Sequence, residues 1–158
     1  MSPGRRPEAG GEGGMSEPLW RFEHAVDCAV PRAFAWAHWT NVGNWADPPA
    51  RFELHGRFAE GARLTTVLPG QRLNWIIREV EAGVGALLEM QVMGAVVGLR
   101  WRFREMGEGQ TRITQTVSLA GDGAEALVEQ ARMFEANLPE GMNKLARAME
   151  RSWQAERD

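Results

Sequence analysis

The sequence predicts an α+β helix-grip fold, in which a seven-stranded curved antiparallel sheet wraps around a long C-terminal helix. Seven segments between residues 20 and 119 alternate polar and apolar residues, which is typical of half-buried strands. After Gly121 the apolar residues recur at three- and four-residue steps, which indicates an amphipathic helix. A sheet with one apolar face must cover that face, and only this helix is long enough to do so.

Residues 1–18 are rich in glycine and proline and contain almost no apolar side chains. Such a segment cannot bury enough surface to offset the entropy of ordering it, so we expect a disordered N-terminal tail. Met15 is a possible alternative start of translation. We expect residues 19–156 to form a single domain.

The first strand, at residues 20–30, places apolar side chains and His24 on one face. Pro31 suits the first turn of a helix, because its missing N–H would have no partner there. We therefore expect two short helices between the first and second strands, one over 31–39 and a second turn or loop over 41–49 that stops at a double proline.

Six further strands are expected at about 51–55, 62–68, 73–82, 86–93, 97–106 and 111–119. The clearest alternation lies in the segment 97–106, where Leu99, Trp101 and Phe103 face one way and three arginines (100, 102 and 104) face the other. We interpret these arginines as exterior.

The long helix is expected to span about 30 residues, or about 45 Å. Asp122 and Glu125 have the spacing of a capping box at its start. Pro139 removes a backbone donor in the middle and Gly141 loosens the next turn, so we expect a kink there.

Three stretches carry a resemblance to a known family: VDCAVPRAFAWAHWTNVGNW, LNWIIREVEAG and GQTRITQTVSL. They resemble the START-like superfamily, also called SRPBCC or birch-pollen-allergen-like, and within it the polyketide cyclase/dehydrase-like branch. The resemblance covers nearly the whole chain after residue 19. Where that family usually has Asp, this chain has Asn41. The resemblance implies a deep apolar cavity between sheet and helix that holds lipids, polyketides, sterols or similar molecules.

The candidate ligand-binding residues are those expected to face this interior. They are His24, Trp36, Trp39, Trp75, Ile77, Met90, Trp101, Phe103, Gln115, Phe134, Leu138 and Met142.

His24 is the candidate catalytic residue. In the sheet of the resembling family the first and last strands are neighbours, so His24 and Gln115 could approach each other. Two interpretations stay open: a buried histidine that is hydrogen-bonded to Gln115 or to a backbone carbonyl, or a donor or general acid/base that faces a ligand.

The stretch AWAHWTNVGNWADPP places Trp36, Trp39 and Trp45 within ten positions. A buried tryptophan removes about 150–250 Å² from water, so plain core explains one or two of these rings. Large rings around a hollow would also suit a planar or aliphatic ligand. Core and cavity lining both remain possible.

Two glutamates on the middle strands, Glu79 and Glu89, are interpreted as part of a solvated face. A bulge expected at Glu79–Val80 leaves the direction of these side chains open. An inward Arg63 or Arg72 would supply an anchor for a carboxylate or enolate, and this alternative also stays open.

Composition argues against several other classes of protein. A net charge of −3 and a pI near 5.7 do not favour nucleic-acid binding. A single cysteine, the lack of a long apolar run and the lack of a secretory signal lead us to expect a cytoplasmic protein without a membrane segment. No residue spacing predicts a metal site, a phosphate loop or a serine nucleophile, so we expect no cofactor.

Three hypotheses for function follow. The leading one is a monomeric or homodimeric carrier for a hydrophobic small molecule in the cavity between sheet and helix. The second is a cyclase or dehydratase-like enzyme that uses the same cavity, although the chain has no tyrosine to supply a phenolic acid. The third is a module that docks another protein through an exposed apolar patch.

Overall fold

The computed structural model describes residues 18–45 and 47–158. Residues 1–17, with the predicted tail and the alternative start at Met15, lie outside this part. The elements in chain order are β2 (Trp20–Cys28), α1 (Arg32–Thr40), the 3₁₀ turn η3 (Val42–Trp45), β3 (Arg51–His55), β4 (Arg63–Leu68), β5 (Gln71–Glu81), β6 (Gly85–Val92), β7 (Ala95–Gly107), β8 (Gln110–Ala120), the 3₁₀ turn η4 (Ala124–Leu127) and α2 (Val128–Arg157).

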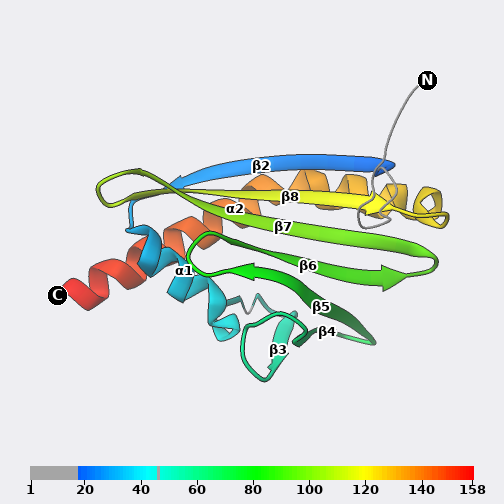
Figure 1. The fold of residues 1–158 in the computed structure, drawn as a ribbon, viewed down its shortest axis with the longest axis horizontal. Helices are drawn as coiled ribbons and strands as arrows, with labels where there is room; N and C mark the ends of the chain where they lie inside the picture. The colour runs from blue at the N-terminus through cyan, green and yellow to red at the C-terminus, as the bar shows by residue number, and fades with distance from the viewer. Residues whose placement is uncertain (1–17, 46) are drawn as a thin grey trace.

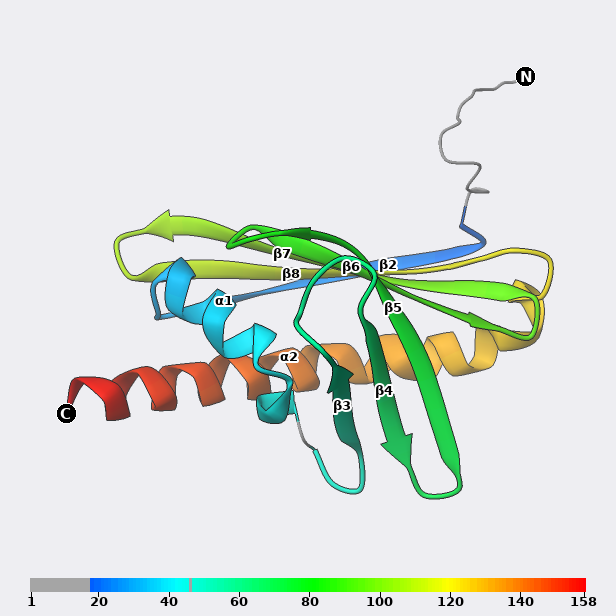
Figure 2. The same cartoon turned by 60° about the horizontal axis from the view of Figure 1, so that its bottom comes forward.

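The seven strands form one antiparallel sheet in the order β2-β8-β7-β6-β5-β4-β3 (Figure 1). The first and last strands are therefore neighbours, as expected. Figure 2 shows α2 running beneath β2 and β8, while β3, β4 and β5 curl down toward the helix. The predicted helix-grip fold is confirmed.

The connection between α1 and the second strand contains η3 in place of a second α-helix. Asn41 ends α1, and its side-chain oxygen accepts a hydrogen bond from the backbone N–H of Gly43 at 3.2 Å. Such a bond from a side chain to a residue two positions on is typical of a turn. Asn41 therefore helps to shape this connection.

The predicted capping box is wrong. The α-helix begins at Val128, six residues after Asp122, and no side chain caps it. The loop before it is fixed by backbone contacts, because the N–H of Gly123 donates to the carbonyl of Gly94 at 3.1 Å. A Cβ on Gly123 would collide with the carbonyl of Met93, so this close approach requires glycine.

The helix α2 has 30 residues and contains Pro139 without ending there. The proline cannot donate a hydrogen bond to the carbonyl of Glu135. Glu135 is exposed, so water is available to that carbonyl.

The predicted position of the bulge is wrong by one residue. The register between β5 and β6 shifts between Ile77 and Glu79, which makes Arg78 the extra residue. Arg78 pairs with Glu89 at 3.0 Å. Both side chains therefore lie on the convex face of the sheet, away from α2.

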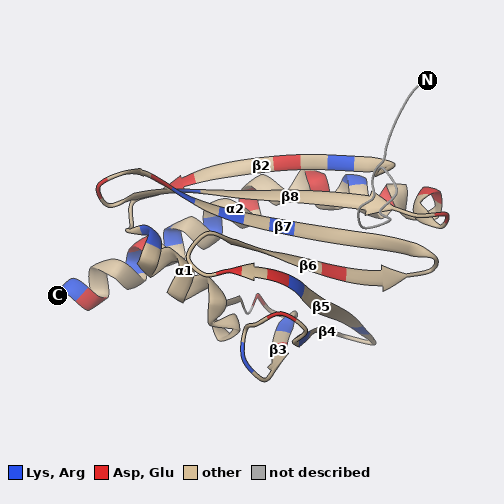
Figure 3. Cartoon of the chain, in the orientation of Figure 1, with Lys and Arg blue, Asp and Glu red and all other residues tan. Residues whose placement is uncertain are grey.

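Figure 3 shows charged residues along β2, β7, β6 and β5, and the strand register places them on the convex face. Glu79 pairs with Arg100 at 3.1 Å on this face, so the solvated interpretation of that glutamate is confirmed. Arg63 and Arg72 are exposed as well, and the alternative of an inward arginine anchor is wrong.

An aromatic cluster fills one end of the interior, where α1 meets the sheet. Trp39 lies at its centre and is 1% exposed, with ring centroids 5.1 Å from Trp101 and 5.4 Å from Phe103. The indole N–H of Trp45 donates to the carbonyl of Trp39 at 2.6 Å. The whole cluster comprises Trp36, Trp39, Trp45, Phe52, Phe58, Trp101 and Phe103.

The end of β2 is joined to the C-terminal half of α2 by three polar contacts, which we call the seam. The thiol of Cys28 donates to the carbonyl of Ala146 at 3.4 Å. The N–H of Ala29 donates to the carboxylate of Glu150 at 2.9 Å, and Arg147 donates to the carbonyl of Asp27 at 3.3 Å. Burial among these groups, with the nearby Glu150 carboxylate, raises the pKa of Cys28 to about 12.

The pKa of Cys28 predicts a dependence of stability on pH. The folded thiol ionises only near 12, whereas the unfolded thiol ionises near its ordinary value of 9.0. The free energy of unfolding should therefore be unaffected by this thiol below about pH 9 and should fall as the pH rises above it. The chain has no tyrosine, which removes one other group that titrates in this range.

We expect Cys28→Ala to flatten this alkaline slope, even if it lowers stability at neutral pH. Urea unfolding followed by tryptophan fluorescence between pH 7.5 and about 10.5 measures both quantities. Equal slopes in the wild type and the variant would contradict the assignment.

The turn between β6 and β7 predicts a stabilising substitution. Met93 and Gly94 form a two-residue hairpin loop with φ values of 52° and 79°, and Met93 is 72% exposed. Hairpins of this length favour Asn-Gly, because both residues adopt positive φ. We expect Met93→Asn to raise the free energy of unfolding by about 1 kcal/mol and Met93→Val to lower it. Thermal and urea unfolding test this, and an Asn variant no more stable than the Val variant would refute it.

Candidate functional site

The sheet presents one face to α2, and we call the side chains on it the concave surface. It comprises Phe22, His24, Val26, Leu64, Thr66, Trp75, Ile77, Ala86, Leu88, Met90, Val97, Leu99, Trp101, Phe103, Ile113, Gln115 and Val117. On the described strands, the acidic and basic residues occupy the alternate positions. Glu105, near the end of β7, is the exception, and it pairs with Arg32 at the surface. Apart from Glu105 at its edge, the concave surface is therefore free of charged side chains.

A row of residues across four strands crosses the middle of this surface. His24 on β2 lies opposite Gln115 on β8, and Gln115 lies opposite Trp101 on β7. Trp101 in turn lies opposite Ala86 on β6. The sequence had suggested that His24 and Gln115 could approach each other, and the register makes them direct neighbours.

The two polar residues of this row differ in burial. His24 is half-buried, whereas Gln115 is only 4% exposed. Within residues 18–45 and 47–158, no hydrogen bond joins them or engages either side chain. The structure therefore places the two side chains next to each other, but neither one makes a hydrogen bond within the described residues.

Two hydroxyl groups near the concave surface are already engaged. Thr66 accepts a hydrogen bond from the indole N–H of Trp75 at 3.2 Å, and Thr111 donates to the carbonyl of Val30 at 2.8 Å. These residues are buried, and their bonds hold strands and loops together. We assign them a structural role.

The candidate aromatic residues fall into two groups. Trp39 and Phe103 are 1% and 2% exposed, so packing alone accounts for them. Trp36 and Trp101 are half-buried at the border of the aromatic cluster, where they could also contact a ligand. Trp75 is buried on the opposite part of the sheet.

The N-terminal half of α2 covers the concave surface incompletely. Phe134 is 42% exposed and packs edge-on against Phe22, with ring centroids 6.1 Å apart. Opposite this half, the sheet residues Met90 and Leu99 are only half-buried. The apolar surface is therefore accessible at the end away from the aromatic cluster.

The remaining candidates belong to the closed part of the interior. Ile77 is fully buried on β5, and Leu138 and Met142 on α2 are 6% and 1% exposed. All three lie in the hydrophobic core.

Two hollows lie outside the space between the sheet and the middle of α2. An open one of about 600 Å³ is lined by Ala29 and by residues of the last turns of α2, including Arg147 and Arg151. A smaller one of about 200 Å³ lies at the β5–β6 turn and includes Val80 and Trp101. Neither corresponds to the deep apolar cavity that the resemblance implied.

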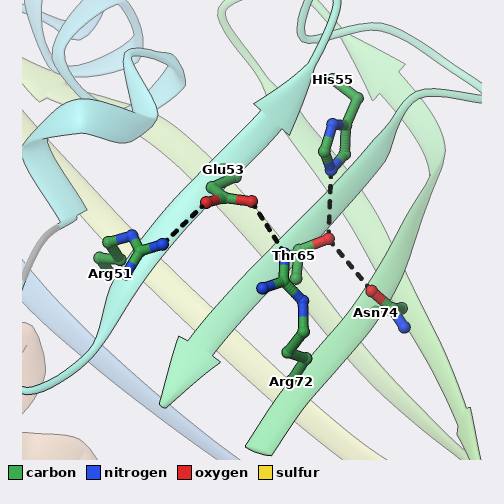
Figure 4. Close-up of polar contacts among 6 residues, drawn as sticks. All are labelled: Arg51, Glu53, His55, Thr65, Arg72 and Asn74. Atoms are coloured by element: carbon green, nitrogen blue, oxygen red, sulfur yellow. Dashed lines mark hydrogen bonds and ion pairs between the residues drawn. The ribbon is translucent and has the colours of Figure 1, made fainter. Parts of the chain in front are cut away.

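Sequence reasoning missed a polar cluster on the convex face of β3, β4 and β5 (Figure 4). Glu53 pairs with Arg51 at 3.2 Å and with Arg72 at 3.1 Å. The hydroxyl of Thr65, a buried residue, donates to Asn74 at 3.1 Å and lies 3.2 Å from the ring Nε2 of His55. These groups satisfy one another, so the cluster holds the sheet edge together.

Two other features bear on function in the part of the chain that the structure describes: metal sites and helices that could span a membrane. In that part, no group of three or more His, Cys, Asp and Glu residues is placed to hold a metal ion. None of the described helices combines the length and the apolar character needed to cross a membrane.

The hypothesis of an interaction module rests on exposed apolar side chains. Among the residues that the structure describes, the large ones are Leu19, Met93, Met106, Met133 and Phe134. Only the last two are adjacent in the sequence, and Phe134 already contacts Phe22. The hypothesis stays a prediction.

Solved structures with the same fold include a norcoclaurine synthase and an aromatase/cyclase. Norcoclaurine synthase from Thalictrum flavum, solved in complex with dopamine and hydroxybenzaldehyde, has a TM-score of 0.66 at 12% identity, covering 86% of this chain and 87% of that one. The Zhui aromatase/cyclase from Streptomyces sp. R1128 has a TM-score of 0.65 at 19% identity, covering 84% and 94%. At these identities the likeness shows the fold alone.

The di-domain ARO/CYC BexL from the BE-7585A biosynthetic pathway has a TM-score of 0.67 at 13% identity. The match covers 82% of this chain and 46% of that chain, so this chain spans about half the length of the di-domain protein. Comparison with curated protein sequences gave no match.

A family model decides the relationship. Residues 20–150 match the family described as "Polyketide cyclase / dehydrase and lipid transport". This span runs from the start of β2 into the last turns of α2, and so includes the sheet and most of the helix that covers it. The chain therefore belongs to the polyketide cyclase/dehydrase and lipid transport family.

Proposed function

We propose that this protein binds a hydrophobic small molecule, such as a lipid or a polyketide, on the concave surface beneath the N-terminal half of α2. One observation carries the proposal: the apolar concave surface is only partly covered at Met90, Val97 and Leu99, whereas the other end of the interior is packed with aromatic rings. Exposed apolar surface of this kind is costly in water and favours a ligand that covers it.

The family supports the proposal, because its description names polyketide cyclases, dehydrases and lipid transport. The complex of norcoclaurine synthase shows that a protein of this fold accommodates small aromatic molecules. Native mass spectrometry of the purified protein, before and after organic extraction, tests for a ligand that co-purifies. A protein that neither carries an extractable ligand nor takes up a neutral apolar dye below about millimolar would refute the proposal.

A charge placed on the accessible part of the concave surface should prevent binding. We expect Leu99→Glu to weaken the binding of the neutral dye N-phenyl-1-naphthylamine at least about tenfold, because the ligand would desolvate the carboxylate. Dye fluorescence gives the Kd, and circular dichroism checks that the variant is folded.

Thr114→Glu is the matched control. Thr114 lies opposite Arg102 on the neighbouring strand and faces the convex side, so the same charge there should leave dye binding unchanged. Equal losses in both variants, or none in either, would contradict the location of the site.

A second candidate function is catalysis of the cyclase or dehydratase type. The observation in its favour is the position of His24, which places a half-buried imidazole on the concave surface in one row with Gln115 and Trp101. An imidazole in contact with a bound ligand could move a proton during aldol cyclisation or loss of water. In this proposal the surface around His24 holds the substrate in one conformation.

Catalysis by His24 makes its own prediction. With a linear poly-β-ketone substrate, we expect His24→Gln to lower turnover at least about 100-fold while dye binding changes less than about twofold. His55→Gln, on the convex face, should keep wild-type turnover. A His24→Gln variant with unchanged turnover would exclude this role and leave the binding proposal intact.

A further inference from the structure

The Gln115 side chain is a buried amide that the described part of the protein leaves without a partner. It is 4% exposed and lies between His24 and Trp101 in the middle row of the concave surface. Buried amides are rarely left without hydrogen bonds, because losing water without a replacement is costly. The partner of this amide must therefore come from outside the described chain: water in the free protein, or a polar group of a ligand that displaces this water.

The amide still has access to open space. Across the described residues, the fully buried side-chain atoms that lack a partner are the indole nitrogen of Trp20 and Nδ1 of His38. Neither amide atom of Gln115 is among them, although neither makes a hydrogen bond with the described residues. Its polar end therefore lies where a ligand could reach it.

Gln115 and His24 together offer complementary hydrogen-bonding groups. An amide has two N–H donors and one carbonyl acceptor, and a neutral imidazole has one donor and one acceptor. Side chains directly opposite each other on antiparallel strands have Cβ atoms about 5 Å apart. One small polar group of a ligand could therefore contact both.

The side chains around Gln115 and His24 determine which polar group of a ligand can bind there. Apart from Glu105 at its edge, the concave surface has no Lys, Arg, Asp or Glu, and the arginines of β7 point to the convex face. A carboxylate, phosphate or ammonium group would lose its hydration there without gaining an opposite charge. An uncharged group would lose much less and would gain hydrogen bonds.

We propose that Gln115 and His24 select an uncharged hydroxyl, phenol or ketone on an otherwise apolar ring system, which packs beside Trp101. This inference rests on the proposed binding function and specifies the chemistry of its ligand. It favours a neutral oxygenated ligand over both a pure hydrocarbon and a free acid.

Three probes that share one ring system test this selection: naphthalene, 2-naphthol and 2-naphthoate at pH 7, with Kd values from quenching of tryptophan fluorescence. For the wild type we expect 2-naphthol to bind about fivefold to tenfold more tightly than naphthalene, which is the net effect of a typical hydrogen bond. We expect 2-naphthoate to bind at least about tenfold more weakly than 2-naphthol.

Gln115→Leu should bind naphthalene as well as the wild type does and should lose the preference for 2-naphthol. Gln115→Met, which keeps the length of the side chain, gives the same test if the leucine variant does not fold. Thr114→Val on the convex face is the control and should keep the preference.

The outcomes separate this inference from the proposed function. Three results would overturn the inference and leave the binding function standing. The wild type could bind naphthalene and 2-naphthol equally well, or it could bind 2-naphthoate most tightly. The preference for 2-naphthol could also survive in both Gln115 variants. Failure of all three probes and of the neutral dye would overturn the proposed function, and this inference with it.

Discussion

The seam between the end of β2 and the C-terminal half of α2 is the constraint on which the rest of the structure depends. Three contacts there join residues 27–29 to the helix. The Cys28 thiol donates to the carbonyl of Ala146, and two backbone groups contact the paired side chains of Arg147 and Glu150. The Cys28 contact is buried, and together with the two exposed hydrogen bonds beside it this contact fixes where the helix lies against the sheet edge. Buried residues such as Ala146 and Met149 then pack against the first strand and the aromatic cluster.

Fixing the helix at one end gives the interior two unlike halves. Near the seam, Trp39 and its neighbours close the space between α1, the sheet and the helix, so this half is a conventional core. Toward the start of α2, Phe134 packs against Phe22 but is still 42% exposed, so the helix covers the sheet only loosely there. A fold that packed both halves equally would have no accessible apolar surface. In the half beneath the start of α2, a bound ligand would supply the apolar contacts that the helix does not make with the sheet.

The two faces of the sheet carry different kinds of side chain. The convex face holds the ion pairs, for example Arg78 with Glu89 and Arg112 with Asp27, and these exposed groups contribute little to stability. The guanidinium of Arg112 lowers the pKa of Asp27, which keeps that carboxylate ionised beside its partner. The concave face is left to apolar groups and to the His24–Gln115 pair. In such surroundings a single polar pair has a large influence on which ligands are accepted, because no charge competes with it.

The sequence by itself determined the order of the elements, the antiparallel sheet, the long helix and the faces of the strands, because a period of two or 3.6 residues is a local property of the chain. It also identified His24 and Gln115 as inward and neighbouring, since resemblance to the family supplied the strand order. It did not determine the bulge at Arg78, the start of α2 at Val128 or the outward direction of Arg63 and Arg72. Nor did it separate Trp39, which is fully buried core, from Trp36 and Trp101, which are only half-buried. Only tertiary structure decided these points, because register shifts, backbone contacts between distant loops and the packing of rings depend on residues far apart in the chain.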